Sequence, residues 1–141
     1  MTVRDASSER VGPLLRRDPE VAFWWGAAVE CTATLLAAQR LDRLTPGDVQ
    51  RARGIFDHLQ ARSFEVQPSD EVRARALRLV ALHDLPTPAA LELAAALVWR
   101  RDLAQPADFV SLHGPLRLAA SLEGFRVLPY ADEVHAPDPG V

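Results

Sequence analysis

Ionisable side chains that come directly after predicted strands are the positions of this chain where chemistry could take place. Glu30 lies in the first turn of a predicted helix over 27–40, which follows the apolar run 21–25. His113 follows another predicted strand, 109–112. In open parallel sheets the functional crevice lies at the carboxyl ends of the strands. Carboxylates gathered at such an edge suit Mg²⁺ or Mn²⁺, since these cations prefer oxygen ligands.

Glu30 is the strongest single candidate. The helix dipole favours a carboxylate in the first turn of a helix. Ala33, Thr34 and Ala37 share its helical face, and their small side chains leave room for a ligand. The alternative is a glutamate that interacts with the helix dipole alone and holds no ligand.

The elements that must position these residues alternate between strands and helices. This alternation predicts an α/β fold with a short parallel sheet flanked by helices. Thr45 and Ser69 are expected to cap the starts of two helices. The predicted strands cover 2–4, 21–25, 64–66, 109–112 and 125–128, and the predicted helices cover 8–17, 27–40, 45–61, 69–83, 87–101 and 115–122.

The helix over 69–83 has a clear apolar pattern. Glu71 and Arg75 are four residues apart and are expected to form an ion pair beside the apolar face. The residues expected to share the buried face are Val72, Ala76, Leu79 and Val80.

Two further side-chain types give local predictions. Trp24 and Trp25 are adjacent in a predicted strand, so they should face opposite sides, with at least one in the core. Cys31 is the only cysteine of the chain, which excludes a disulfide framework and a cysteine-based metal site. We expect it to be a buried, inert thiol.

Composition predicts one compact domain. The chain has 141 residues, of which 48% are hydrophobic, enough for a sizeable core. We expect a single domain over 1–135 and a frayed, Pro/Gly-rich tail over 136–141. The net charge of −3 excludes tight nucleic-acid binding through bulk charge alone.

Membrane insertion and secretion are not expected. The longest apolar stretch, 89–99, is too short to cross a bilayer. The polar residues 1–5 lack the apolar region of a signal peptide, so we expect a cytoplasmic protein.

Three segments, in order along the chain, resemble the PIN domain and within it the VapC ribonuclease toxins. They are VAFWWGAAVECTATLLAAQ (21–39), LPTPAALELAAALVW (85–99) and FVSLHGPLRLAASLEGFRVLP (109–129). The resemblance covers most of 8–129. It implies a three-layer fold, a homodimer, a groove for an antitoxin peptide, and cleavage of RNA by about four acids with one or two Mg²⁺ or Mn²⁺ ions.

The resemblance places the acids unevenly. Asp5 matches the first acid, although it could equally be a solvated N-terminal residue, and Glu30 matches the second. Ala89 stands where the third is expected, with Glu92 one turn later as either a substitute ligand or a surface or interface glutamate. His113 replaces the fourth acid, and the alternative for it is an exposed loop histidine. A neutral histidine can bind Mn²⁺ or Zn²⁺ but suits Mg²⁺ poorly.

Two functional hypotheses follow from this pattern. The first is a VapC-like protein of a toxin–antitoxin type system that is catalytically impaired and acts by binding a partner. The alternative is an active, divalent-metal-dependent endoribonuclease. It would use Glu30 and Asp5 as catalytic residues and the set Asp5, Glu30, Glu92 and His113 as metal ligands. Only the alternative requires RNA, and it predicts that these four side chains converge. A remnant of a toxin gene with no retained function is a third possibility.

Overall fold

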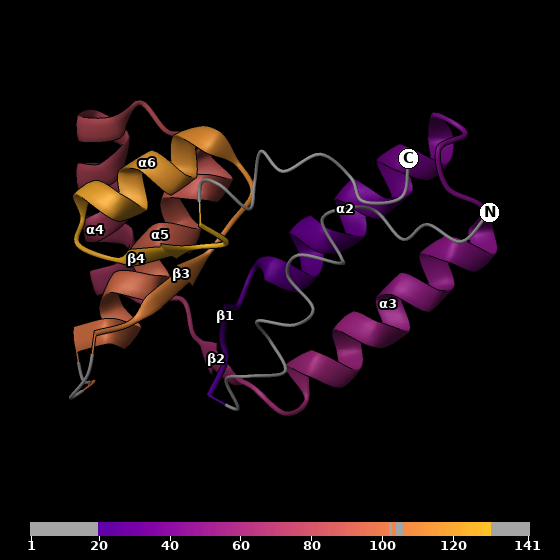
Figure 1. Cartoon of the computed structure of the whole chain (residues 1–141), viewed down its shortest axis with the longest axis horizontal. Coiled ribbons are helices and arrows are strands. Elements are labelled where there is room, and N and C mark those ends of the chain that lie inside the picture. The colour runs from indigo at the N-terminus through magenta and orange to yellow at the C-terminus, as the bar shows by residue number, and fades with distance from the viewer. Residues whose placement is uncertain (1–19, 102, 104–105, 131–141) are drawn as a thin grey trace.

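The computed structural model describes residues 20–101, 103 and 106–130. In this part of the chain, helices and short strands alternate, as the sequence predicts (Figure 1). The elements are β1 (Ala22–Trp24), α2 (Ala27–Arg40), α3 (Pro46–Gln60), β2 (Phe64–Val66), α4 (Asp70–His83), α5 (Thr87–Arg101), β3 (Asp108–Val110), α6 (Gly114–Leu122) and β4 (Arg126–Leu128).

The strands form two parallel pairs. β1 pairs with β2, with Trp24 opposite Val66, and β3 pairs with β4, with Val110 opposite Leu128. The α2–α3 segment connects the first pair, and α6 connects the second. The α/β class and the parallel pairing are therefore confirmed. The described strands lie in two separate two-stranded sheets rather than in one continuous sheet.

The core is centred on α5, which packs against α4, α6 and β1. Leu79 of α4 and Leu93 and Ala94 of α5 are fully buried. Small alanine side chains along α5 let neighbouring elements approach its backbone closely, so one helix can pack against α4, α6 and the β1–β2 pair.

The α2–α3 hairpin extends away from the body formed by α4, α5 and α6 (Figure 1). No residue of α2 is fully buried, and Val49 is the single fully buried residue of α3. An edge-to-face contact between Phe23 and Phe56, with ring centroids 5.4 Å apart, connects the hairpin to β1. The hairpin therefore leaves much of its apolar surface exposed, including Val29 and Ile55.

Helix starts agree closely with the sequence predictions. Thr45 and Asp48 form a capping box, in which each side chain accepts a hydrogen bond from the other residue's backbone N–H. Ser69 caps α4 by accepting from the Val72 N–H. These predictions succeed because capping depends on residues only three positions apart.

Predictions for α4 are confirmed with one exception. Glu71 and Arg75 pair at 3.2 Å, and Val72, Ala76 and Leu79 are buried. The prediction that Val80 is buried is wrong, because its side chain is 44% exposed. Val80 lies on the side of α4, next to the buried face formed by Val72, Ala76 and Leu79.

The two tryptophans face different environments, as predicted, although Trp25 lies just beyond the end of β1. Trp24 is 8% exposed and belongs to the core, whereas Trp25 is 50% exposed.

The strand over 2–4, the helix over 8–17 and the tail over 136–141 lie outside the described residues. In the described part of the chain, no helix has the length and apolar character needed to cross a bilayer.

Candidate functional site

Glu30 is held at the carboxyl edge of the β1–β2 pair. β1 ends at Trp24, and Gly26 caps the start of α2. The Glu30 backbone N–H donates to the Gly26 carbonyl at 3.1 Å, which fixes Glu30 in the first turn. The carboxylate is partly buried, and this burial raises its pKa. Its position after the strand agrees with the sequence prediction.

Glu92 is the second acid near the β1–β2 pair. It lies on α5, which packs against β1, and its side chain is partly buried. Burial is the main cause that raises its pKa to about 7, and the negative charge of Glu30 raises it further. Glu92 is therefore near enough to Glu30 for the charge of Glu30 to affect it, and it is not an exposed surface side chain.

Glu30 and Glu92 have no cationic partner among the residues that the structure describes. In the described part of the chain, neither Glu30 nor Glu92 forms an ion pair with an arginine or histidine. Two carboxylates in partial burial repel each other when both are ionised. Such a pair can share a proton or bind a cation, so it is a candidate for acid–base or metal chemistry.

Position 89 lies in the core rather than at this pair. Ala89 is 7% exposed and belongs to the core cluster that surrounds α5. A carboxylate at that position would be enclosed by apolar side chains. On α5, Glu92 is therefore the acid available to the β1–β2 edge.

His113 is not grouped with Glu30 and Glu92. His113 is exposed and precedes α6 at the edge of the β3–β4 pair. Among the described residues, no three His, Cys, Asp or Glu side chains form a group that could hold a metal ion. Asp5 lies outside the described residues, so its convergence with Glu30 stays a prediction.

Cys31 neighbours Glu30 in sequence and is a free thiol. It is partly buried, less enclosed than predicted, because α2 belongs to the projecting hairpin. Burial is the main cause that raises its pKa, followed by the charge of Asp57. A raised pKa keeps the thiol protonated and unreactive.

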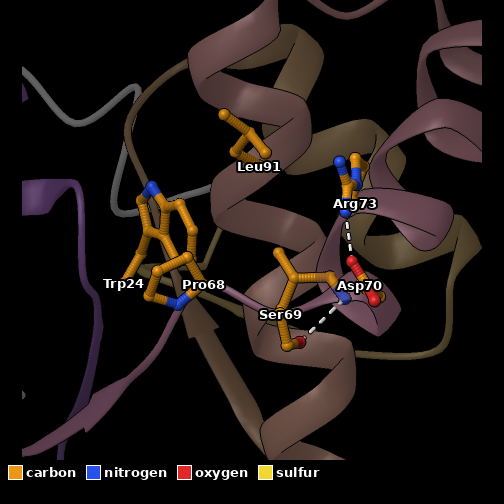
Figure 2. A pocket seen from close by; sticks show the side chains of 7 residues that line it. Trp24, Pro68, Ser69, Asp70, Arg73 and Leu91 are labelled. Atoms are coloured by element: carbon orange, nitrogen blue, oxygen red, sulfur yellow. Dashed lines mark hydrogen bonds and ion pairs between the residues drawn. The ribbon is translucent and has the colours of Figure 1, made fainter.

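A pocket of about 430 Å³ opens at the same carboxyl edge (Figure 2). Trp24 comes from the end of β1, Pro68 and Ser69 follow β2, and Leu91 comes from α5. The complete lining is Trp24, Pro68, Ser69, Asp70, Val72, Arg73 and Leu91. The sequence predicted that at least one of Trp24 and Trp25 is in the core and that Ser69 caps a helix, but no local pattern indicated that Trp24 and Ser69 share a pocket.

The β3–β4 edge is occupied by internal hydrogen bonds. The Arg117 guanidinium donates to the Ser111 carbonyl at 2.6 Å and to the Pro129 carbonyl at 2.5 Å. These bonds connect α6 to the ends of both strands. The arrangement stabilises the fold and leaves this arginine little capacity to bind a ligand.

Glu123, which follows α6, forms a second fully paired group. It accepts hydrogen bonds from Arg78 at 2.8 and 3.0 Å and contacts the His83 Nε2 at 2.8 Å. The Arg78 hydrogen bonds are the main cause that lowers the pKa of Glu123 to about 2, and His83 contributes. This network joins α4 to the end of α6 and is structural.

Comparisons of the chain with protein-family models, with curated proteins and with solved structures each return no match.

Proposed function

We propose that this chain is a VapC-like PIN protein of a toxin–antitoxin type system with a reduced acidic site, in which Glu30 and Glu92 bind one Mg²⁺ or Mn²⁺ ion. The observation that carries the proposal is that two partly buried carboxylates, one of which feels the charge of the other, form no ion pair among the described residues. Glu30 follows β1 at the carboxyl edge of a parallel strand pair, where ligands bind in open α/β sheets.

The donor set fits such an ion in chemical type. Carboxylate oxygens are hard ligands, and a divalent cation would relieve the repulsion between Glu30 and Glu92. A bound ion would supply charge stabilisation at an RNA phosphodiester and activate a water molecule. The side chains of Glu30 and Glu92 would hold and orient it.

The site is smaller than the four-acid set that the resemblance implies. Position 89 is an alanine in the core, and His113 is not grouped with the glutamates. Fewer carboxylates give weaker metal binding and less transition-state stabilisation. We therefore expect RNA cleavage, where it occurs, to be slow and to require millimolar metal.

Calorimetric titration with Mn²⁺ tests the metal site directly. Saturable binding to the wild type should be lost in Glu30→Gln and in Glu92→Gln. Asp57→Asn, which removes an exposed acid on α3, is the matched control and should bind as the wild type does. Unchanged binding in both glutamate variants, or no saturable binding to the wild type, would overturn the metal site. A single-stranded RNA cleavage assay with the same proteins then measures activity.

Partner binding without catalysis is the second candidate, and exposed apolar surface supports it. Leu77 and Val80 on α4, and Leu118 and Leu122 on α6, are exposed. Such surfaces are typical of self-association. A trough of about 540 Å³ on α2 suits the apolar face of an antitoxin peptide; its described lining is Ala28, Val29, Thr32, Ala33, Leu36 and Arg40.

Light scattering measures the homodimer that this second candidate requires. A mass twice that of the chain should fall to the monomer value in a Leu77→Asp, Leu118→Asp variant. Ile55→Asp on α3 is the matched control and should keep the wild-type mass. A monomeric wild type at high protein concentration would count against the homodimer.

A further inference from the structure

α2 is an apolar helix that the other described elements do not fully cover. None of its 14 residues is fully buried, and only Glu30 and Arg40 are charged. By contrast α5, which is also rich in alanine and leucine, has six fully buried residues. Helices that are apolar on most sides are normally enclosed by other elements. The exposed face of α2 is therefore a surface on which a further segment should pack.

A trough of about 540 Å³ follows this face. The residues recur at intervals of three and four, so they form one stripe along the helix. The stripe is apolar over most of its length and ends at the guanidinium of Arg40. An occupant should therefore offer apolar side chains together with an acid near Arg40. The described lining is Ala28, Val29, Thr32, Ala33, Leu36 and Arg40, all on α2.

The arginines of the α2–α3 hairpin differ from those of the body. Arg40, Arg43 and Arg53 are exposed and form no ion pair with any residue that the structure describes. From Arg73 to Arg126, each described arginine binds an acid or a carbonyl oxygen. Unpaired guanidinium groups beside an apolar trough favour an acidic occupant.

The segment 131–141, which follows β4, has the composition that such an occupant needs. Its sequence, ADEVHAPDPGV, contains three acids and neither arginine nor lysine. Val134 directly follows two of the acids, Asp132 and Glu133, so apolar and acidic side chains alternate closely. Residues 1–19 carry four arginines against three acids and are not complementary to the hairpin. Charge therefore selects 131–141 over 1–19.

The segment is also long enough to follow the trough. Val127 of β4 and Ala27, the first residue of α2, pack against the same core cluster. The segment therefore begins a few residues beyond the core on which α2 also starts. Its 11 residues span about 35 Å when extended, whereas the 14 residues of α2 rise about 21 Å along the helix axis.

We propose that the segment 131–141 lies along the α2 trough of its own chain, with its acids bound by Arg40 and the neighbouring arginines of the hairpin. The contact combines burial of apolar surface on α2 with ion pairs that salt screens. It does not depend on the metal site. A partner peptide that uses the same trough must first displace the segment, so the segment would act as a built-in competitor.

Paramagnetic relaxation in NMR tests this contact in the full chain. A nitroxide is attached to Val141→Cys after Cys31, the only native cysteine, has been replaced by alanine. We expect the backbone N–H signals of Val29 and Leu36 to broaden, while that of Leu77 on α4 stays sharp. EDTA in all samples removes any contribution from the metal site. The spectrum after chemical reduction of the nitroxide is the control for folding.

Charge variants test how the segment is recognised. Asp132→Asn combined with Glu133→Gln should weaken the broadening at Leu36 by roughly two- to fivefold, and Arg40→Gln should do the same, since exposed ion pairs contribute modestly. Raising the NaCl concentration to 0.5 M should act in the same direction. Arg62→Gln, which removes an exposed arginine just beyond α3, is the matched control and should leave the broadening unchanged.

A mixed sample distinguishes the chain's own segment from that of a second copy. Nitroxide-labelled chains without isotopes are added to isotope-labelled chains without nitroxide. No broadening in this mixture, together with broadening of α2 in the doubly labelled chain, would support the proposal. Broadening that appears equally in the mixture would mean that a second copy covers the trough and would overturn it. Absence of broadening at α2 in both samples, or broadening insensitive to the charge variants and to salt, would also overturn it, while Mn²⁺ binding could persist.

Discussion

Glu92 and Glu123 are the same residue type, both partly buried, yet their surroundings shift their pKa values in opposite directions. Glu123, with 14% of its side chain exposed, is bound by Arg78 and His83, and its pKa falls to about 2. Glu92 has Glu30 as its charged neighbour, and its pKa rises to about 7. One site stabilises the ionised carboxylate, whereas the other destabilises it until a proton or a cation binds.

The contrast extends to the edges of the two strand pairs. At the β3–β4 pair, Asp108 binds Arg126 through two hydrogen bonds, and Arg117 binds the strand ends. At the β1–β2 pair, Glu30 and Glu92 form no ion pair with any residue that the structure describes. Carboxylates that are partly buried and lack a basic partner are better functional candidates than carboxylates held in ion pairs.

Removing Glu123 should give the largest effect on stability. Glu123→Ala leaves Arg78 and His83 without their shared acceptor and should lower the free energy of unfolding by about 2–3 kcal/mol at pH 7. Urea unfolding measures this change. Because the folded pKa is lowered, the stabilisation is present above the ordinary value of 4.5 and is lost as the pH falls from 4.5 toward 2.

The matched control for this prediction is Asp108→Ala. Its partner Arg126 has 61% of its side chain exposed, so the loss should stay below about 1 kcal/mol. Equal losses in the two variants would contradict the view that Glu123 is the principal paired acid of the fold.

Replacing Glu92 should have the opposite sign. The folded pKa is raised from 4.5 to about 7, so ionisation opposes folding increasingly as the pH rises from 4.5 to 7. Glu92→Gln should therefore stabilise the metal-free protein by on the order of 2 kcal/mol at pH 8 and change little at pH 4. Thermal unfolding in EDTA at both pH values measures the difference.

Glu65→Gln is the control for that measurement, because Glu65 is a partly buried glutamate that accepts hydrogen bonds from Gln60 and Gln67. It should not stabilise the protein at either pH. A destabilised Glu92→Gln variant at pH 8 would mean that the carboxylate has a cationic partner or a structural role.

The sequence predicts local structure well and the site only in part. Capping at Thr45 and Ser69, and the placement of Glu30 after β1, follow from residues a few positions apart. The proximity of Glu92 to Glu30 depends on how α5 packs against β1, which no short pattern encodes. The Trp24 pocket was missed for the same reason, since its walls come from segments more than 60 residues apart.

The smallest expected effect is the change in the pKa of Glu92 when the charge of Glu30 is removed. Because burial is the main cause of the raised pKa of Glu92 and Glu30 is the second, Glu30→Gln should lower that pKa while leaving it above 4.5. The interaction removed should be worth at most about 1 kcal/mol, as for charges in partial contact with water. NMR titration of the Glu92 side-chain carboxyl carbon measures this pKa.

An unchanged pKa of Glu92 would show that the charge of Glu30 does not reach it, and a return of the pKa to 4.5 would show that burial contributes little. Either result would remove the basis for treating Glu30 and Glu92 as a buried, coupled pair.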